Sequence, residues 1–335
     1  MPLDLLVPDL LLPPDAPPVL RAVRLPALEK WLARADIERS PGPGPEGWLA
    51  EHHGLAPPVA VAAIAIAGEV DAARPGDWIR ADPVHLRIDG DSVVVHDPAV
   101  LGLRREEADA LVAALREFFA QDALRFHAPA PDRWYVEVPR GELPSTVPLE
   151  AARGRNAFGM LPSGGKAIHW RSAMTEAQMV LSEHPVNRRR EAAGEPAVNS
   201  VWFWGEGSAP ERIARRYDSV HADDPFARGL ARLSGAALRP LPARIGEVEP
   251  APRDASRLAV LDAMSAPLHR VALEAWMAAA ASLDERWFGG LGEAIERFGS
   301  VRLILPRAED SLVATLGPAA RRRWLRRAKP LASHA

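Results

Sequence analysis

The stretch HPVNRRREAAGEPAVNSVWFWGEG, residues 184–207, decides how the fold is interpreted from the sequence. It follows a predicted helix over residues 170–183 and ends in SVWFWG, an aromatic and β-branched run that is typical of a strand. Further apolar runs are expected to be buried strands, and they occupy residues 3–12, 257–263 and 300–305. Helices are predicted between these runs, over residues 25–35, 225–233 and 267–298, the last interrupted near Gly289 and Gly290. Strands that alternate with helices predict an α/β protein with a mostly parallel sheet and helices on both faces.

Residues 77–141 differ from the rest of the chain in their pattern of apolar and polar residues. Alternating, β-branched and aromatic positions predict strands over residues 78–88, 92–95 and 134–138. Between them LRREEADALVAALREFFAQ, residues 103–121, has the apolar spacing of an amphipathic helix. Strands around one helix predict a small α+β unit, inserted into a core domain of residues 1–76 and 142–335. The tail PAARRRWLRRAKPL, residues 318–331, is predicted to be a basic helix.

The composition limits the classes of function. A net charge of −3 creates no global field that would recruit nucleic acid or an anionic membrane, so we expect neither as a partner. The absence of cysteine excludes disulfides, thiolate metal sites and cysteine nucleophiles. The amino-terminal residues are interrupted by Asp4, Asp9 and prolines and lack a basic leader, so no signal peptide is predicted. Because no apolar run is long enough to span a bilayer, we expect a cytoplasmic protein.

Residues 184–207 resemble the archaeal-type cofactor-independent phosphoglycerate mutases, in which a similar His-Pro-Val-Asn ends a helix and Pro-Ala-Asn precedes a strand. The following DDPFARGLARLSG, residues 223–235, resembles the next family segment. PGDWIRADPVHLRIDG, residues 75–90, and LRREEADALVAAL, residues 103–115, resemble the family's inserted part. The resemblance implies an alkaline-phosphatase-like α/β core with an inserted lid. It also implies a cleft that, in the mutases, holds a phosphorylated three-carbon acid.

Four longer runs resemble a bacterial group of RpfE-type regulatory proteins more closely still. These runs are WIRADPVHLR, RWYVEVP, EAQMVLSEHPVN and NSVWFWGEG. Their length and order are specific to the group, whose biochemical role the sequence does not state. This second resemblance implies a regulatory protein built on the mutase scaffold.

The mutase mechanism needs a hydroxyl nucleophile between two divalent ions held by carboxylates and imidazoles. At the equivalent places this chain keeps Asp9 after its first strand and His269 in LDAMSAPLHR, where Ser265 replaces a carboxylate. The nucleophile turn corresponds to APPVAVAAIA, residues 56–65, which contains no hydroxyl, and LPRAEDSLVA, residues 305–314, contains no histidine. We therefore predict no metal, no other cofactor and no mutase activity by this mechanism, and the sequence identifies no catalytic residue.

Five polar residues are the candidates for binding a small anion. Asn187 and Asn199 lie between a helix and a strand, where open α/β sheets bind ligands, and arginine suits the paired oxygens of phosphate or carboxylate. The candidate ligand-binding residues are Arg80, His184, Asn187, Arg190 and Asn199. The alternatives are an Arg80–Asp82 ion pair that stabilises the insertion, and roles in capping turns and helix ends for the others. The adjacent His52 and His53 make a poor metal pair and are expected at the surface.

Three functions remain open from the sequence. The favoured one is a non-catalytic binding or regulatory protein for a phosphorylated or carboxylated metabolite. The second is an enzyme with a rearranged or metal-free site, acting as a phosphoglycerate mutase or a phosphate-ester hydrolase. The third is an interaction module that uses the insertion or the basic residues 321–329. The ligand, a protein partner and the oligomeric state stay undetermined.

Overall fold

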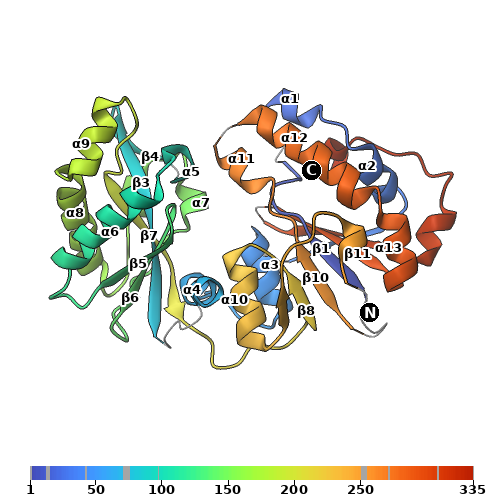
Figure 1. The fold of residues 1–335 in the computed structure, drawn as a ribbon, viewed down its shortest axis with the longest axis horizontal. Coiled ribbons are helices and arrows are strands. Elements are labelled where there is room, and N and C mark those ends of the chain that lie inside the picture. Colours follow the sequence, from blue (N-terminus) through green and yellow to red (C-terminus); the bar gives the residue numbers. More distant parts are fainter. Residues whose placement is uncertain are drawn as a thin grey trace. The chain divides into compact units, whose positions relative to one another are not determined.

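The computed structural model describes residues 2–12, 16–41, 44–70, 76–96, 98–249, 255–270, 272–307 and 309–334. The chain divides into two compact units, which Figure 1 shows as ribbons. Unit 1 consists of Met1–Pro57 and Arg212–Ala335, and unit 2 consists of Pro58–Glu211. Unit 2 is therefore a continuous insertion between two distant parts of unit 1.

Unit 1 contains a seven-stranded sheet in the order β2-β12-β11-β1-β10-β8-β9. Its parallel strands are β1 (Leu3–Leu6), β8 (Ser219–His221), β9 (Ala237–Arg239), β10 (Arg257–Val260) and β11 (Val301–Pro306). Two antiparallel strands, β12 (Ser311–Leu316) and β2 (Asp36–Ser40), complete one edge. The apolar runs predicted as buried strands form β1, β10 and β11 at its centre. The predicted α/β class with a mostly parallel sheet is confirmed.

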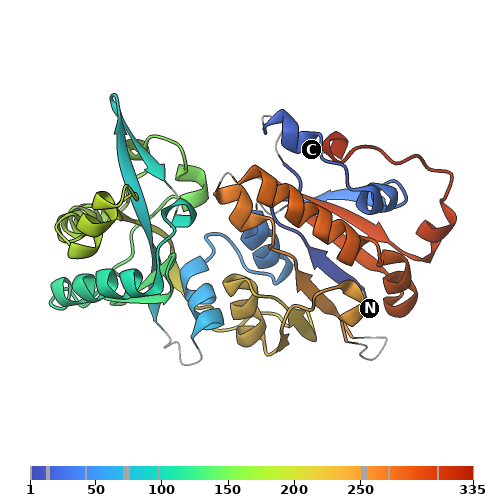
Figure 2. The same ribbon diagram turned by 45° about the horizontal axis from the view of Figure 1, so that its top comes forward.

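Helices cover both faces of this sheet (Figure 2). One face, with Leu3 and Leu5 pointing into it, packs against α2 (Pro26–Leu32), α12 (Leu273–Leu283) and α13 (Leu291–Phe298). The other face contacts α3 (Gly44–His52) and α10 (Pro225–Ser234). Helix α10 begins where the sequence predicts, because the Asp224 side chain accepts from the Ala227 amide, and it ends at left-handed Gly235. Shorter elements are α1 (Pro18–Arg21), α11 (Ser265–His269), a π-helical turn (Asp284–Phe288) and 3₁₀ turns at Ile245–Glu247, Pro318–Arg322 and Leu331–His334.

One predicted helical stretch of unit 1 is divided more than expected, and another is wrong. The stretch predicted over residues 267–298 is interrupted at Gly289 and Gly290 as predicted, but it is also divided into α11 and α12 before that point. The basic tail helix is wrong: only Pro318–Arg322 forms a 3₁₀ turn, and residues 323–330 are not helical. The tail lacks an apolar stripe that could pack, so its arginines anchor it by side-chain bonds instead.

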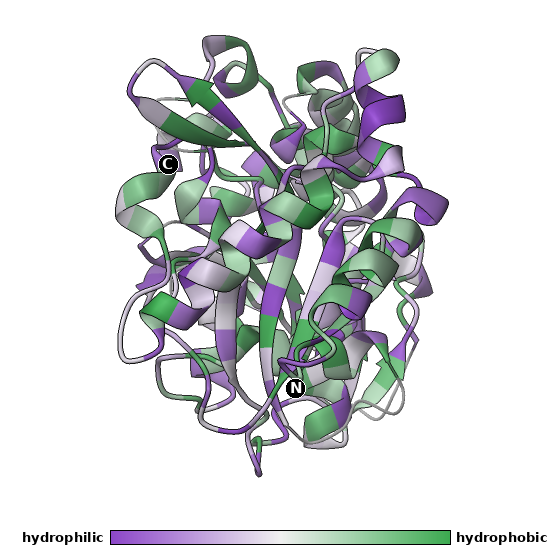
Figure 3. Cartoon of the chain, turned by 90° about the vertical axis from the view of Figure 1, so that its left-hand side faces the viewer, coloured by the Kyte–Doolittle hydropathy of each residue, from purple (hydrophilic) through white to green (hydrophobic). Residues whose placement is uncertain are grey.

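Unit 2 contains a five-stranded sheet in which every strand pair is antiparallel. Its strands are β3 (Asp77–Asp89), β4 (Ser92–His96), β5 (Arg125–Ala130), β6 (Arg133–Val138) and β7 (Ser200–Ser208). One face packs against α6 (Arg105–Phe118) and α8 (Ala167–Ser182), and the other against α4 (Val61–Glu69), as Figure 1 shows. Coloured by hydropathy, helices carry both hydrophilic and hydrophobic segments (Figure 3), as expected where one side is buried.

The boundaries of unit 2 differ from those predicted for the insertion. The unit extends beyond residues 77–141 because β7 pairs along the first half of β3 and α8 packs on the same core as α6. It also includes α5 (Pro98–Leu101), α7 (Leu149–Ala152), the 3₁₀ turn Ala157–Met160 and α9 (Pro185–Ala192). The aromatic run SVWFWG thus forms a strand as predicted, but in the inserted unit. No helix among the described ranges has the length and apolar character needed to cross a membrane.

Candidate functional site

The carboxyl edge of the unit 1 sheet brings together the two residues that the sequence equates with mutase metal ligands. Asp9 lies three residues beyond β1, in a left-handed conformation with φ 58°, and its carbonyl accepts from the Trp276 indole at 3.2 Å. His269 ends α11, and its Nε2 lies 3.8 Å from Asp9 Oδ2. Both side chains are about a quarter exposed, at 24% and 26%. Their place beyond the ends of parallel strands is where such sheets bind ligands.

This edge does not fit a two-metal centre. Across the residues that the structure describes, no three His, Asp or Glu side chains are grouped so that they would hold a metal ion. A carboxylate and an imidazole supply two ligands, whereas a protein-bound transition metal normally takes at least three from the chain. The residues present therefore fit neither of the family's two ions.

The segment equated with the nucleophile turn, residues 56–65, begins as a non-helical stretch and continues into the apolar helix α4, in unit 2. Its sequence, VAAIAIAGE, carries no hydroxyl, and its start packs closely on β7. A Cβ added to Gly207 would lie 2.5 Å from Ala60 Cβ, and one added to Gly205 would lie 3.1 Å from Val61 Cβ. These glycines let the helix approach the strand backbone. The helical part of the segment is therefore a packing element, and its non-helical part, Ala56–Ala60, offers no hydroxyl.

Arg80, in the first half of β3, is buried and bonded within unit 2. Its guanidinium donates to Asp82 at 2.7 and 2.9 Å, and it lies over the rings of Tyr135 (4.7 Å) and Trp204 (5.1 Å). Asp82 also accepts from the Trp204 indole at 2.7 Å. Burial alone would lower the pKa of Arg80, but the attraction of Asp82 outweighs it and raises this pKa. The alternative interpretation from the sequence, a pair within the insertion, describes this geometry.

The neighbouring candidates are also bonded inside unit 2. His184 is the N-cap of α9, and its Nδ1 accepts from the Val186 amide at 3.2 Å. Asn187, with no exposed surface, donates to the carbonyls of Leu181 and Val198 and accepts from the Val198 amide. Asn199 exchanges two bonds with the backbone of Leu86, at 2.7 and 2.9 Å. These three side chains tie α9 and the start of β7 to their surroundings.

Arg190 joins α9 to the start of α6. Its side chain is 1% exposed, and its Nη1 donates to Glu107 Oε2 at 2.9 Å. Further bonds run to the carbonyls of Pro196 and Leu101. Glu107 also caps α6 by accepting from the Arg104 amide. All five predicted residues thus lie in one unit, where each has a partner within the protein.

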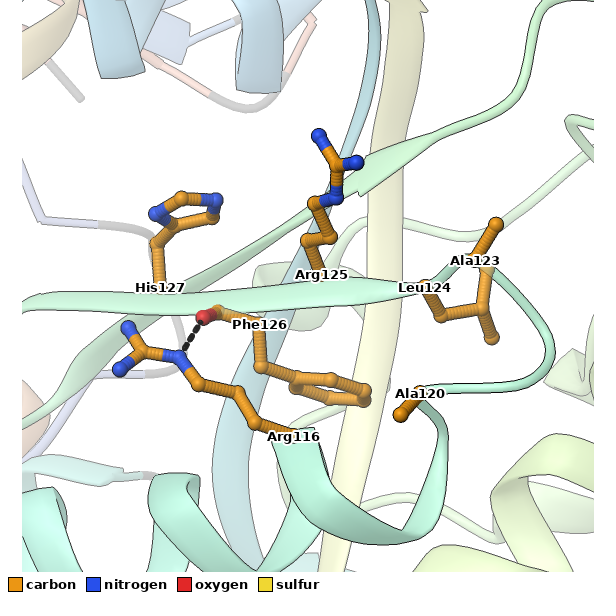
Figure 4. Close-up of a pocket in the computed structure, with 7 residues that line it drawn as sticks. All are labelled: Arg116, Ala120, Ala123, Leu124, Arg125, Phe126 and His127. Atoms are coloured by element: carbon orange, nitrogen blue, oxygen red, sulfur yellow. Dashed lines mark hydrogen bonds between the residues drawn. The ribbon is translucent and has the colours of Figure 1, made fainter.

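A cavity of about 400 Å³ lies elsewhere in unit 2, between the end of α6 and β5 (Figure 4). Arg116, from the last turn of α6, donates from Nε to the Phe126 carbonyl. Arg125 and His127 are two residues apart on β5 and point to the same side, as the close-up shows. The full lining is Arg116, Ala120, Ala123, Leu124, Arg125, Phe126 and His127, which includes no carboxylate.

The electrostatics of this cavity favour an anion, although one carboxylate lies nearby. Glu137 Oε2 lies 3.6 Å from Arg125 and 3.9 Å from His127 Nε2. Burial lowers the pKa of His127, and Arg116 lowers it further. The imidazole is therefore neutral at pH 7, and the two guanidiniums supply the positive charge. Sequence reasoning missed this cavity, since the alternation in RFH places Arg125 and His127 together but gives no sign of Arg116 beside them.

A buried polar cluster also lies in unit 1, near His52 and His53. The expected surface position is wrong for His53, which is 3% exposed and bonds to the Leu49 carbonyl at 2.8 Å. His52 stacks on Trp48 with ring centroids 4.8 Å apart. Burial, with nearby Arg302, lowers the pKa of His52 to about 4. Both rings face Tyr217, and the Tyr217 hydroxyl donates to Asp4 at 2.7 Å.

Comparison with known proteins gives the chain's relationships. No protein-family model matches it. A probable 2,3-bisphosphoglycerate-independent phosphoglycerate mutase of Geobacter sulfurreducens is 26% identical over 245 residues, covering 67% of this chain and 61% of that protein. The corresponding mutase 2 of Methanothermobacter thermautotrophicus is 31% identical over 163 residues, covering 45% and 39%. The matched part of this chain thus spans less than two thirds of each relative.

A solved structure shares the fold. The PH0037 protein from Pyrococcus horikoshii superposes with a TM-score of 0.56 and 15% identity, covering 99% of this chain and 92% of that one. The sequence matches show that this chain is homologous to the archaeal-type cofactor-independent phosphoglycerate mutases over the matched residues.

Proposed function

We propose that this protein is a non-catalytic homologue of the phosphoglycerate mutases that binds a small phosphorylated or carboxylated metabolite. The observation that carries the proposal is the pair Asp9–His269, which stands at the carboxyl edge of the sheet without a third ligand from any described residue. The apolar helix α4 supports it, because this segment supplies no nucleophile where the mutases need one.

The finer identity rests on the longer sequence runs. We infer that the chain belongs with the bacterial RpfE-type regulatory proteins, because WIRADPVHLR and NSVWFWGEG resemble runs of that group. A regulatory protein in the cytoplasm needs to bind its signal but does not need to turn it over. The loss of metal ligands with retention of the scaffold agrees with such a role.

The α6–β5 cavity is our proposed ligand site, in place of the five residues that the sequence singled out. Each of those five has polar atoms bonded within unit 2, and no described cavity opens onto them. Arg116 and Arg125 also have partners, in the Phe126 carbonyl and Glu137, but they border open space of about 400 Å³, within the usual range for a small-molecule site. Guanidinium groups suit the paired oxygens of a phosphate or carboxylate.

The catalytic part of the proposal is tested by a mutase assay with added manganese, cobalt or magnesium. The purified protein should leave 3-phosphoglycerate unchanged with each ion, while the Geobacter sulfurreducens relative is assayed beside it as the comparison. Metal content after purification should stay far below one ion per chain. Turnover that depends on a stoichiometric metal ion, and that Asp9→Asn abolishes, would favour the enzyme alternative instead.

The binding part is tested by thermal shift with phosphoglycerates, phosphoenolpyruvate, citrate and inorganic phosphate. A ligand at a hundred times its Kd stabilises the folded state by about 2.7 kcal/mol, which raises Tm measurably. Arg116→Ala and Arg125→Ala should each abolish the shift. Arg87→Ala is the matched control, because this exposed arginine lies on β3 and pairs only loosely with Asp89, at 3.5 Å. A shift that survives both cavity variants would place the ligand elsewhere.

A further inference from the structure

Near its carboxyl end the chain exposes two large apolar side chains in succession. Trp324 is 68% exposed and Leu325 is 76% exposed, and both belong to a turn that follows the 3₁₀ turn Pro318–Arg322. The red end of the chain runs there as an open loop (Figures 1 and 2). Residues 322–329, RRWLRRAK, are called the basic loop below. Exposure of adjacent Trp and Leu side chains at one turn indicates a contact surface.

The basic loop is anchored to unit 1 on both sides. Before the turn, Arg323 bonds to Asp36 at 2.6 Å and to the Arg34 carbonyl at 2.9 Å. After the loop, Leu331 is buried in the core of unit 1 and its amide donates to Glu29 at 3.2 Å. Both ends of the loop are therefore fixed to unit 1. Between these ends Trp324 and Leu325 remain exposed to solvent.

The charge of the basic loop has one sign. No acidic residue occurs between residues 311 and 335. Arg323 is neutralised by Asp36, but Arg322, Arg327 and Lys329 are exposed and form no ion pair with any residue in the described ranges. The apolar pair is thus flanked by three cations that no described residue neutralises.

These features match an anionic lipid surface better than other anions. Lipid headgroups take the cations, Trp is favoured at the boundary between headgroups and acyl chains, and Leu gains from entering that boundary. A single-stranded nucleic acid would stack on Trp324 but leave Leu325 in water. A protein partner would need a cavity shaped for two protruding side chains, whereas a lipid interface adapts to them.

We infer that the basic loop binds the surface of membranes that contain anionic lipid. This goes beyond the proposed function and differs from the expectation, drawn from net charge and apolar run length, that no membrane is a partner. That expectation concerned the whole chain, whereas the loop is a local surface. Each cation near an anionic bilayer strengthens binding by roughly fivefold. The attachment is peripheral and reversible, because two apolar side chains insert little hydrocarbon.

The test is co-sedimentation of the full chain with vesicles of phosphatidylcholine alone or mixed with phosphatidylglycerol. Binding should require phosphatidylglycerol and weaken at high salt, which screens the headgroup charge. The charge variant, Arg322→Gln with Arg327→Gln and Lys329→Gln, should bind at least tenfold more weakly. The apolar variant, Trp324→Ser with Leu325→Ser, should lose several-fold in affinity while keeping its salt dependence.

Matched controls lie on exposed positions elsewhere. Arg188→Gln with Arg189→Gln and Arg212→Gln removes three exposed arginines, and Ile168→Ser with Met179→Ser removes two exposed apolar side chains. Both controls should bind vesicles as the unchanged protein does, and unchanged Tm values verify folding. The inference is overturned if no vesicles bind, if neutral vesicles bind equally, or if the controls weaken binding as much as the loop variants. Loop-dependent binding of a single-stranded oligonucleotide without vesicle binding would likewise overturn it.

Discussion

The polar groups inside unit 2 and those at the carboxyl edge of unit 1 are held in opposite ways. Arg190 is 1% exposed, and its three guanidinium nitrogens each donate to a protein acceptor, which are Glu107 and two backbone carbonyls. Asp9 and His269 are about a quarter exposed and lie 3.8 Å apart. Residues of the first kind maintain the fold. Those of the second kind lie at an accessible sheet edge, and we expect the stability of the fold to depend on them little.

The strongest test of this comparison is Arg190→Ala. Removing the guanidinium leaves Glu107 largely buried with one partner fewer, and breaking a buried pair costs about 3–5 kcal/mol. Urea unfolding monitored by circular dichroism should show a loss of this size. Exposed Arg188→Ala, on the same helix, should change stability by less than about 0.5 kcal/mol. If the two variants unfold alike, Arg190 is not the structural residue that we describe.

A second variant tests the packing of α4 on β7. In Gly207→Ala the new methyl group would lie 2.5 Å from Ala60 Cβ, so the helix must move, at a cost of about 1–3 kcal/mol. Thermal unfolding should show a lower Tm. Gly194→Ala is the matched control, because its φ of 73° is also positive, so that backbone strain is present there too, but a Cβ meets nothing within 4 Å. Equal Tm values for the two variants would mean that α4 does not depend on this close approach.

Acid should destabilise unit 1 through its buried histidines. The folded-state pKa of His52 is lowered to about 4, so the unfolded chain binds the proton more tightly. Stability is therefore complete above the unfolded pKa of about 6.5 and falls as the pH drops toward 4. Discounted for partial exposure, the loss is about 1–2 kcal/mol. Urea midpoints measured from pH 7 to 4 should fall less steeply for His52→Gln, whereas exposed His169→Gln should follow the unchanged protein.

The smallest effect is expected at the Asp9–His269 pair. A partly exposed carboxylate–imidazole pair contributes at most about 1 kcal/mol, so Asp9→Asn and His269→Gln should each leave the urea midpoint almost unchanged. This outcome would sharpen the contrast with Arg190→Ala. A loss above about 2 kcal/mol in either variant would instead show that the edge of unit 1 is as tightly built as the interior of unit 2.

The sequence predicted the elements whose signals are local. Apolar runs identified β1, β10 and β11, and amphipathic spacing identified α6. It did not predict that β7 joins the inserted sheet. The two paired strands, β3 and β7, are more than a hundred residues apart in the sequence, and local composition does not indicate which distant strands pair. The same limit applied to the site. Asn187 has the same side chain whether it faces a ligand or the backbone of Val198, and only the fold decides between them.

The central position of β1 determines when unit 1 can form during synthesis. This strand, Leu3–Leu6, is synthesised before the other strands of its sheet, and both of its neighbours, β10 and β11, are made only after residue 256. The strands and helices of unit 2 come from one continuous stretch of chain, so unit 2 can fold before β10 and β11 are synthesised. During that time the apolar strand β1 stays unpaired, although unit 2 is already folded. This order makes the amino-terminal strand the segment most dependent on chaperones that shield nascent chains.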